Sequence, residues 1–374
     1  MFGFSARRTA AAASARRLRC SWFLVLTLSF TATPLVAAPQ KETQEPQETF
    51  KDRIEVTGEA GSTLTAPGLA AAQKEVEAIA GGATVLDAEP VRNGRASTLD
   101  DVLAFAPGVV AQPRFGAEEA RLSIRGSGLQ RTFHGRGLKL LQDGVPLNLA
   151  DGGFDFQAVE PLSARYVQVL RGANGLELGS STLGGAINFV TPSGRDATPW
   201  NGRIEGGDFG YLRGQAAASF ARDRFDFLTS LSHFEQDGFR DHARQNTQRL
   251  FGNLGFRADE SRESRVYWAA VRTDSELPGS LTRAQLDANP RQAAAGNLAL
   301  DQKRDFDLFR LSTKNAWLAS ERSRFEWNAY GSQKHLDHPI FQVIDQRSLD
   351  LGADLRFERS GEFRGRAHRF LVGF

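Results

Sequence analysis

The stretch Ser348-Leu-Asp-Leu-Gly-Ala-Asp-Leu-Arg-Phe-Glu358 alternates between apolar and polar residues along most of its length. In an extended chain, Leu349, Leu351 and Leu355 point to one side and the charged residues point to the other. This period of two predicts a β-strand with one apolar and one polar face. Residues 324–332 show the same alternation, so the pattern is not confined to one segment.

The pattern recurs throughout the C-terminal part of the chain. We predict nine strands, at residues 201–208, 211–221, 224–234, 248–257, 264–272, 306–317, 324–334, 347–358 and 366–374. Short turns alternate with long loops, and the long loops are 235–247, 273–305 and 335–346. Strands with one apolar face, short turns at one end and long loops at the other are typical of an outer-membrane β-barrel. A soluble β-sandwich is the alternative, but it does not require this alternation of loop length.

Residues 72–196 predict a compact domain ahead of these strands. Its short strands are expected at 83–87, 121–125, 138–142, 166–170 and 186–191. Ser97-Thr-Leu-Asp100 has the form of a helix capping box, and Asp143-Gly-Val-Pro146 has the form of a turn. The fold class is therefore an α+β domain followed by an antiparallel transmembrane β-barrel, whose strands occupy residues 197–374.

Residues 1–38 have the three parts of a secretory signal peptide. They hold five arginines and no acidic residue, an apolar run from Trp22 to Phe30, and a cleavage site at Val36-Ala37-Ala38. Residues 39–71 are predicted to be a linker, because their first part is polar and rich in Pro, Gln and Glu.

Composition argues against several classes of function. Without the five arginines of the signal, the formal charge falls from +2 to −3, so no nucleic-acid partner is expected. Cys20 is the single cysteine and leaves with the signal, which excludes disulfides and thiol chemistry. No Ser/His/Asp set or carboxylate pair stands out for catalysis, and no cofactor or metal site is expected. We therefore predict that the protein is not an enzyme.

Four segments carry a resemblance to a known family. They are Leu122-Ser-Ile-Arg-Gly126, Leu141-Gln-Asp-Gly-Val-Pro146, Val167-Gln-Val-Leu-Arg-Gly172 and Leu183-Gly-Gly-Ala-Ile-Asn-Phe-Val-Thr191. In this order, behind a signal peptide and ahead of alternating strands, they resemble the plug domain of TonB-dependent outer-membrane receptors. Gln168 and Ala173 depart from the Glu and Pro common in that family, which does not change the assignment. Residues 129–137 and 148–153 are similar to the ferric-citrate and siderophore receptors.

The resemblance implies a receptor in the outer membrane of a Gram-negative bacterium that imports a scarce ligand into the periplasm. TonB, powered by ExbB–ExbD, would supply the energy, because the outer membrane has neither an ion gradient nor nucleotides. Ile54, Glu55, Val56 and Thr57 fit the TonB box, since a short extended segment without proline can add as a strand to a partner's sheet.

A ferric siderophore is the ligand that the resemblance favours, with haem, cobalamin or another cofactor or metal chelate left open. Two rival functions are a non-transporting adhesion or signalling barrel and an enzyme housed in a barrel. The linker at residues 39–51 is too short for a folded signalling domain, and no catalytic constellation is visible.

Two sets of side chains are candidates for specific roles. Arg125 and Arg171 each precede a glycine, and we expect them to latch the plug to the barrel by pairing with carboxylates of the barrel wall. Loops of the plug that face outward would meet the ligand. The ligand-binding candidates are Arg114, Phe115, Arg131, His134 and Arg136. Their cations and rings suit an anionic chelate with aromatic groups.

A size argument predicts that the barrel needs more strands than these nine. A plug of about 120 residues has a radius of roughly 17 Å. Nine strands about 4.8 Å apart and tilted by about 40° enclose a radius of only ~9 Å, whereas 22 strands enclose roughly 22 Å. We therefore expect a truncated barrel with nine of about 22 strands, from a fragment or a disrupted gene.

Overall fold

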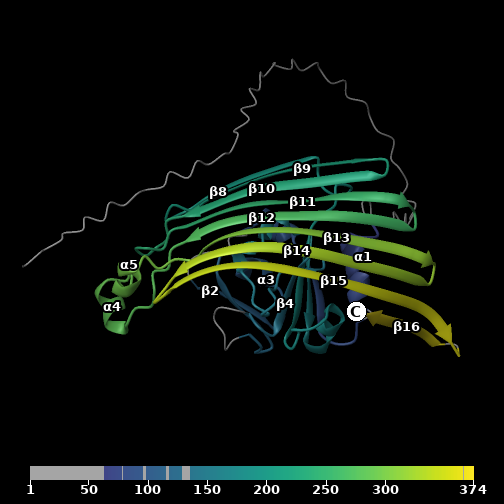
Figure 1. The fold of residues 1–374 in the computed structure, drawn as a ribbon, viewed down its shortest axis with the longest axis horizontal. Coiled ribbons are helices and arrows are strands. Elements are labelled where there is room, and N and C mark those ends of the chain that lie inside the picture. Colours follow the sequence, from purple (N-terminus) through teal and green to yellow (C-terminus); the bar gives the residue numbers. More distant parts are fainter. Residues whose placement is uncertain (1–62, 78, 96–97, 115–117, 129–134, 365) are drawn as a thin grey trace, which may run out of the picture. The chain divides into compact units, whose positions relative to one another are not determined.

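A nine-stranded antiparallel sheet, which we call the wall, dominates the computed structural model (Figure 1). The structure describes residues 63–374 except 78, 96–97, 115–117, 129–134 and 365. The wall consists of β8 (Trp200–Gly206), β9 (Leu212–Arg222), β10 (Phe225–Gln236), β11 (Gln245–Asp259), β12 (Arg262–Ser275), β13 (Asp305–Ser320), β14 (Ser323–Pro339), β15 (Val343–Phe363) and β16 (Arg366–Gly373). Each strand pairs with its sequence neighbour, so the sheet runs from β8 to β16 without a crossover.

All nine predicted strands are confirmed, and most are longer than the alternation indicated. The main difference is at residues 335–346, where a long loop was expected. There, β14 and β15 continue in register as far as the pair Pro339 and Val343. The reason is apolar burial, since Leu336 and Ile344 pack against Phe306 in a small core on the inner face of the wall.

The two faces of the wall differ as the sequence predicts. Leu349 and Leu351 are 71% and 74% exposed on the outer face, whereas Arg249 and Arg265 are buried on the inner face. Aromatic rings also gather on the outer face near the short turns, where Phe325 lies between Trp317 and Phe357 at centroid distances of 5.4 and 4.6 Å. In the part of the chain that the structure describes, no helix is long and apolar enough to cross a membrane.

The residues ahead of the wall form an α+β domain, which we call the inner domain (residues 63–199). Its helical elements are α1 (Leu69–Glu77), α2 (Glu89–Asn93), α3 (Leu99–Leu103), η1 (Phe156–Ala158), η2 (Pro161–Ser163) and η3 (Gly172–Leu178). Its strands are β1 (Ala83–Asp87), β2 (Val109–Pro113), β3 (Ala120–Ile124), β4 (Leu138–Gln142), β5 (Val145–Pro146), β6 (Tyr166–Arg171) and β7 (Gly185–Val190). Five of them form a sheet in the order β1-β6-β7-β4-β5, and β2 pairs with β3.

Local sequence explains two features of the inner domain. Asp143 and Gly144 both have positive φ, of 56° and 83°, which closes the tight hairpin between β4 and β5. The helix α3 begins with a capping box, but Thr98 and Asp101 form it, one residue later than predicted. A buried apolar core that includes Leu140, Val169 and Ile187 then holds the sheet and helices together.

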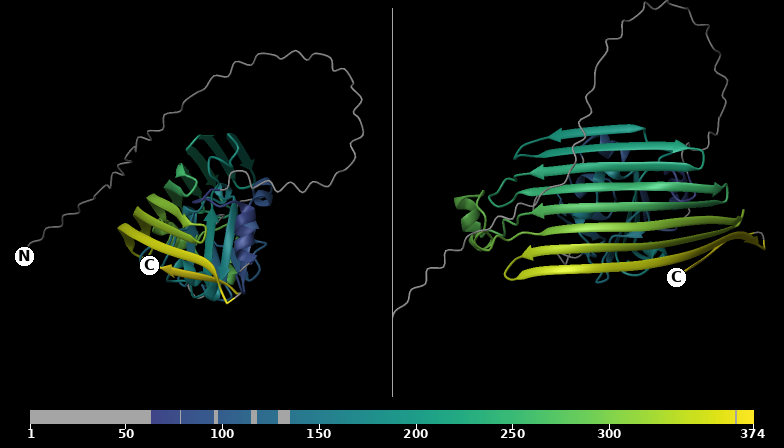
Figure 2. Two further views of the ribbon diagram at one scale, coloured as in Figure 1. Left: turned by 90° about the vertical axis from the view of Figure 1, so that its right-hand side faces the viewer. Right: turned by 45° about the horizontal axis from the view of Figure 1, so that its top comes forward.

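The inner domain lies against the inner, polar face of the wall, which curves around it (Figures 1 and 2). Contacts between the two are largely hydrogen bonds and ion pairs, such as Arg249 to the Gln157 carbonyl at 2.7 Å and Asn253 to the Pro192 carbonyl at 3.0 Å. The wall therefore presents hydrophobic residues outward and hydrogen-bonding groups inward to a separate folded domain.

We predict that Gly185→Ala destabilises the inner domain by at least about 2 kcal/mol. Gly185 has a φ of +133°, and a Cβ there would lie 2.1 Å from the Leu170 carbonyl oxygen of the neighbouring strand. Gly202→Ala is the matched control, because a Cβ at Gly202 meets nothing within 4 Å. Thermal unfolding followed by calorimetry would measure both; equal melting temperatures would contradict the prediction.

Candidate functional site

The connections between wall strands divide the wall into two ends. Residues 207–211, 237–244 and 276–304 lie at one end, which we call the loop end, and 276–304 carries α4 (Arg283–Ala288) and α5 (Ala295–Ala299). Short turns such as 223–224 and 260–261 lie at the other end, which we call the turn end. This division fixes where each contact with the inner domain lies along the strands.

Glu118 and Glu160 of the inner domain are buried against the wall near its loop end. Glu118 accepts hydrogen bonds from Arg213 at 3.1 Å and from Arg249 at 2.7 Å. Glu160 lies 3.5 Å from Arg249 Nη1 and accepts a hydrogen bond from Ser232. Burial raises the pKa of Glu160, but Arg249 and Arg213 outweigh burial and hold that pKa below its usual range. The carboxylate is therefore charged and paired.

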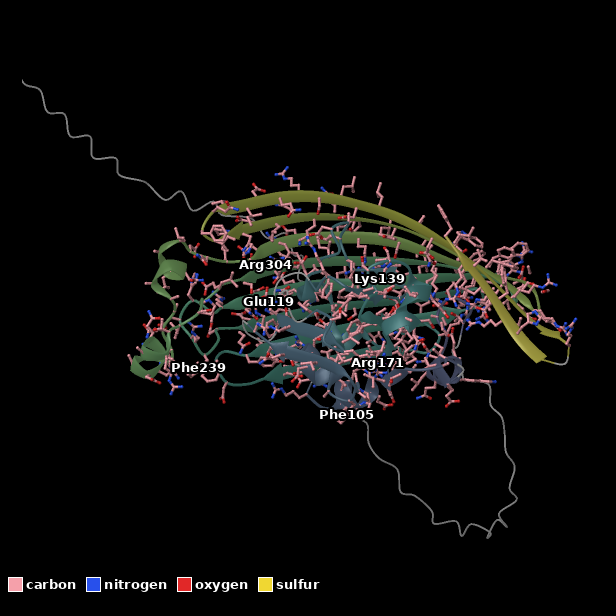
Figure 3. The ribbon with its side chains drawn as sticks, turned by 90° about the horizontal axis from the view of Figure 1, so that it is seen from below. Phe105, Glu119, Lys139, Arg171, Phe239 and Arg304 are labelled. Atoms are coloured by element: carbon pink, nitrogen blue, oxygen red, sulfur yellow. The ribbon has the colours of Figure 1, made fainter. Side chains whose placement is uncertain are left out.

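Asp155 and Glu119 form a second cluster with the wall. Asp155 accepts hydrogen bonds from Arg304 and Lys334. Arg304 also lies 3.9 Å from Glu119, and Figure 3 shows these two residues toward the end of the wall that carries α4 and α5. Burial raises the pKa of Asp155, but Arg304 and Lys334 outweigh it and lower the pKa to about 2. For Glu119, burial prevails and raises the pKa.

The two clusters balance charge at the interface. Each joins two carboxylates of the inner domain to two cations of the wall or its loop end. A paired, buried charge adds little net stability, whereas separating the pair leaves charges without partners in a poorly solvated place. The clusters therefore hold the inner domain in one position, and moving it costs several kcal/mol for each ion that loses its partner.

The entry of the chain into the inner domain is also fixed to the wall, toward the turn end. Glu263 accepts hydrogen bonds from the Leu64 amide at 3.0 Å and from the Thr65 hydroxyl. Arg265 donates to Thr65 Oγ1 at 3.0 Å and to Asp226 at 2.6 and 3.0 Å. The segment that follows residues 54–57 is thus held by a buried charged group of the wall.

One of the two predicted latch residues has a hydrogen bond within the inner domain. Arg171 is 6% exposed and donates a hydrogen bond to Thr84 at 2.9 Å, within the inner domain. Burial and the nearby Arg125 both lower the pKa of Arg171. Among the described side chains, no ion pair to the wall is found for Arg125 or Arg171, so their latch role stays a prediction. The observed clusters have the opposite arrangement, with carboxylates on the inner domain and cations on the wall.

Two of the five ligand-binding candidates lie in described parts of the chain. Arg114 follows β2, is half-buried, and has its pKa lowered by burial. Arg136 donates to Asp151 at 2.8 Å, and both side chains are largely exposed. Phe115, Arg131, His134 and the segment Ile54–Thr57 lie outside the described residues. Within the described ranges, no group of three or more His, Cys, Asp or Glu side chains could hold a metal ion.

Sequence reasoning did not single out the charged residues that join the two domains. They include Glu118, Glu119, Asp155 and Glu160 of the inner domain, and Arg213, Arg249, Arg265, Arg304 and Lys334. A signal was present on the wall side, because Arg213, Arg249 and Arg265 fall on the polar face of their alternating strands. The inner-domain acids lie in loops or 3₁₀ turns, where no periodicity marks them.

Comparison with known proteins finds a family model and relatives that match part of the chain. Residues 75–186 match the family model described as the TonB-dependent receptor plug domain. The vitamin B12 transporter BtuB of Vibrio vulnificus is 32% identical over 111 residues, which cover 29% of this chain and 17% of that protein. A hemin receptor of Yersinia enterocolitica is 26% identical over 194 residues, which cover 52% of this chain and 26% of that protein.

Solved structures show the same fold over both domains. The ferric citrate transporter FecA in its unliganded form aligns with a TM-score of 0.67 at 19% identity, over 82% of this chain and 48% of that one. The ferric yersiniabactin uptake receptor FyuA of Yersinia pestis aligns with a TM-score of 0.62 at 18% identity, over 75% and 46%. The chain thus spans about half the length of these structures and about a quarter or less of the two sequence relatives.

We predict that Asp155→Asn destabilises the inner domain against the wall by about 3–5 kcal/mol, because Arg304 and Lys334 then lose their carboxylate. Asp151→Asn, in the exposed pair with Arg136, should cost about 1 kcal/mol or less. Denaturant unfolding at neutral pH would compare them, and equal effects would contradict the prediction. In the wild type, the pKa of Asp155 is about 2 in the folded protein, below its ordinary value of 3.8. The stabilisation from its ion pairs is therefore complete above pH 3.8 and is lost as the pH falls through 2.

Proposed function

Because the chain carries a plug domain of the TonB-dependent receptors followed by wall strands like theirs, we propose that it acts in an importer of the Gram-negative outer membrane. The exposed apolar face of the wall would contact lipid, and the aromatic side chains near the turn end would lie at the membrane interface. The loop end would then face outward, and the turn end would face the periplasm.

One observation supports an energy-driven importer above all others. The inner domain occupies the inner face of the wall and is held there by two buried, charge-balanced clusters. A ligand can pass only if the inner domain moves, which requires separating ion pairs at a cost of several kcal/mol each. The outer membrane offers no nucleotide or ion gradient for this work, so we propose that it comes from TonB with ExbB–ExbD.

The N-terminal segment supports the same mechanism. Ile54-Glu-Val-Thr57 is the proposed TonB box, and the chain is fixed to Glu263 and Arg265 only a few residues later. A pull on the box would therefore reach the wall contacts of Leu64 and Thr65 before it reaches the core of the inner domain. Strand addition through main-chain hydrogen bonds suits such a handle, because it does not require a folded docking surface.

The proposed ligand is a ferric siderophore, with Arg114, Phe115, Arg131, His134 and Arg136 as its contacts. Solved structures of a ferric citrate transporter and a ferric yersiniabactin uptake receptor share the fold, which supports this choice. Haem and vitamin B12 are the alternatives, since sequence relatives include a hemin receptor and a vitamin B12 transporter. Growth of a deletion strain on a panel of iron sources, and on vitamin B12, would decide between them.

We predict that Ile54→Pro or Val56→Pro abolishes uptake and leaves ligand binding at the cell surface unchanged. Proline removes a main-chain donor and so prevents strand addition. Gln47→Pro, in the same linker but outside the box, is the matched control and should import normally. Radiolabelled uptake and binding on whole cells would measure both quantities. Normal uptake by both box variants would show that residues 54–57 are not the box.

A further inference from the structure

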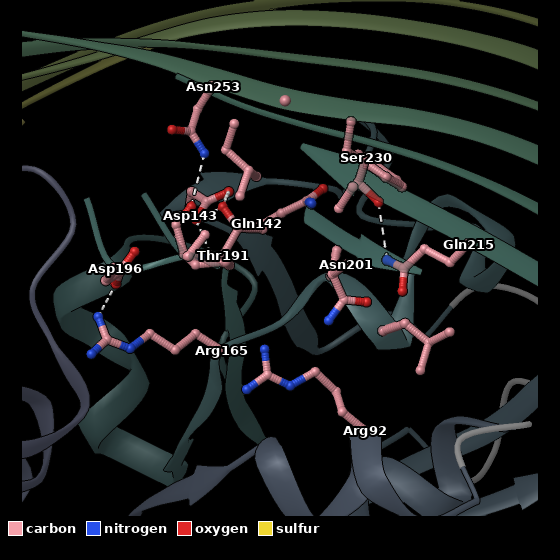
Figure 4. A pocket seen from close by; sticks show the side chains of 18 of the residues that line it. Arg92, Gln142, Asp143, Arg165, Thr191, Asp196, Asn201, Gln215, Ser230 and Asn253 are labelled. Carbon is pink, nitrogen blue, oxygen red and sulfur yellow. Dashed lines mark hydrogen bonds and ion pairs between the residues drawn. The ribbon is translucent and has the colours of Figure 1, made fainter. Parts of the chain in front are cut away.

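A cavity of about 440 Å³ lies between the inner domain and the middle of the wall (Figure 4). The wall side contributes Gln215, Ser230 and Asn253, and the inner domain contributes Arg92, Gln142 and Arg165. Apolar side chains, including Leu228, Phe251 and Trp268 of the wall, also line the cavity. The two charge clusters lie closer to the loop end, so the cavity is farther from the outside than they are.

Arg310 of β13 is a buried cation that lines this cavity. It is 7% exposed, and its Nη2 donates to Gln142 at 2.6 Å. In the described part of the chain it has no carboxylate at ion-pair distance, in contrast to Arg213, Arg249 and Arg265 on the same face. A guanidinium has about five N–H donors, so most of those of Arg310 remain available to a ligand.

Two further donors stand beside Arg310 on the inner face of the wall. Ser312 is two residues along β13, and Tyr267 of β12 lies directly opposite Ser312 in the strand register. Opposite residues on one face are ~5 Å apart and diagonal ones ~7 Å, so the three side chains converge. Tyr267 and Ser312 are 8% and 5% exposed, and neither hydroxyl has a hydrogen-bond partner among the described residues.

Asp143 is the carboxylate that opposes Arg310 among the described residues. Lys314 and Arg310 both face Asp143, and Lys314 also faces Glu326 and Asp354 of the wall. Asp226 and Glu263 lie near Tyr267 but are paired with Arg265. Asp143 already accepts hydrogen bonds from the Thr191 amide at 2.8 Å and the Thr191 hydroxyl at 2.9 Å. The carboxylate that opposes Arg310 therefore has its acceptor positions partly used. On the far side of the cavity, Arg165 is paired with Asp196.

We propose that Arg310, Tyr267 and Ser312 form a weak anion site that binds the carboxylates of an anionic cargo on its way past the inner domain. A charge-assisted guanidinium contact with two hydroxyl donors suits a carboxylate. The negative charge of Asp143 lowers the affinity of the site for an anion, so a bound carboxylate dissociates readily. The transit role rests on the proposed function, whereas the anion site itself does not.

Iodide is the probe for the site, because its anomalous scattering locates it in crystals without any cargo. Crystals of the protein purified from outer membranes and soaked in sodium iodide should show a peak beside Arg310 and Tyr267. Arg310→Gln should remove the peak, Tyr267→Phe should weaken it, and Asp143→Asn should strengthen it. Added citrate should displace it. No peak in the wild type, or a peak that persists in Arg310→Gln as an adventitious ion only, would overturn the site.

Uptake tests the transit role separately, with the chelate that the growth panel identifies. Arg310→Gln should slow uptake about tenfold and leave surface binding unchanged, since one charged hydrogen bond is lost. Arg272→Gln is the matched control, because Arg272 is a half-exposed arginine of β12 paired with Asp307 outside the cavity. Unchanged uptake in Arg310→Gln would overturn the transit role. An iodide peak in a wild type that imports nothing would instead refute the proposed function.

Discussion

The burial of inner-domain carboxylates against cations of the wall is the interaction on which the rest of the structure depends. Glu118 and Asp155 reach across to Arg249 and Lys334, whereas apolar side chains on the inner face of the wall, such as Phe251 and Phe306, pack against one another. Other large apolar side chains of the wall, such as Leu349 and Leu351, are exposed on its outer face. Specific charge pairing is therefore what positions the inner domain within the wall.

Most of the fold could be predicted from the sequence, because one face of each wall strand is apolar and a period of two is hard to mistake. The exceptions have local physical causes. Residues 335–346 look polar, yet Leu336 and Ile344 bury enough apolar surface to extend two strands through them. The cap of α3 lies one residue later than expected, because Thr98 and Asp101 form the capping box at the helix start.

The site was less predictable, because its pairs join distant parts of the chain. Glu118 is separated from Arg213 by 95 residues and from Arg249 by 131. Alternation shows that Arg213 and Arg249 face inward, but it cannot show which carboxylate meets them. For Arg125 and Arg171, sequence position suggested contact with the wall, whereas Arg171 bonds Thr84 of its own domain. Pairing depends on tertiary arrangement, which no local pattern encodes.

Both ends of the inner domain meet the wall at one place. Arg265 donates to Thr65 where the chain enters the domain, and Asp226, which pairs with Arg265, accepts from the Gly194 amide and Arg195 where the chain leaves. These contacts close a loop of roughly 130 residues. A loop whose two ends are held together has less conformational entropy to lose on folding than a chain with free ends, so these paired contacts favour the compact state of the inner domain.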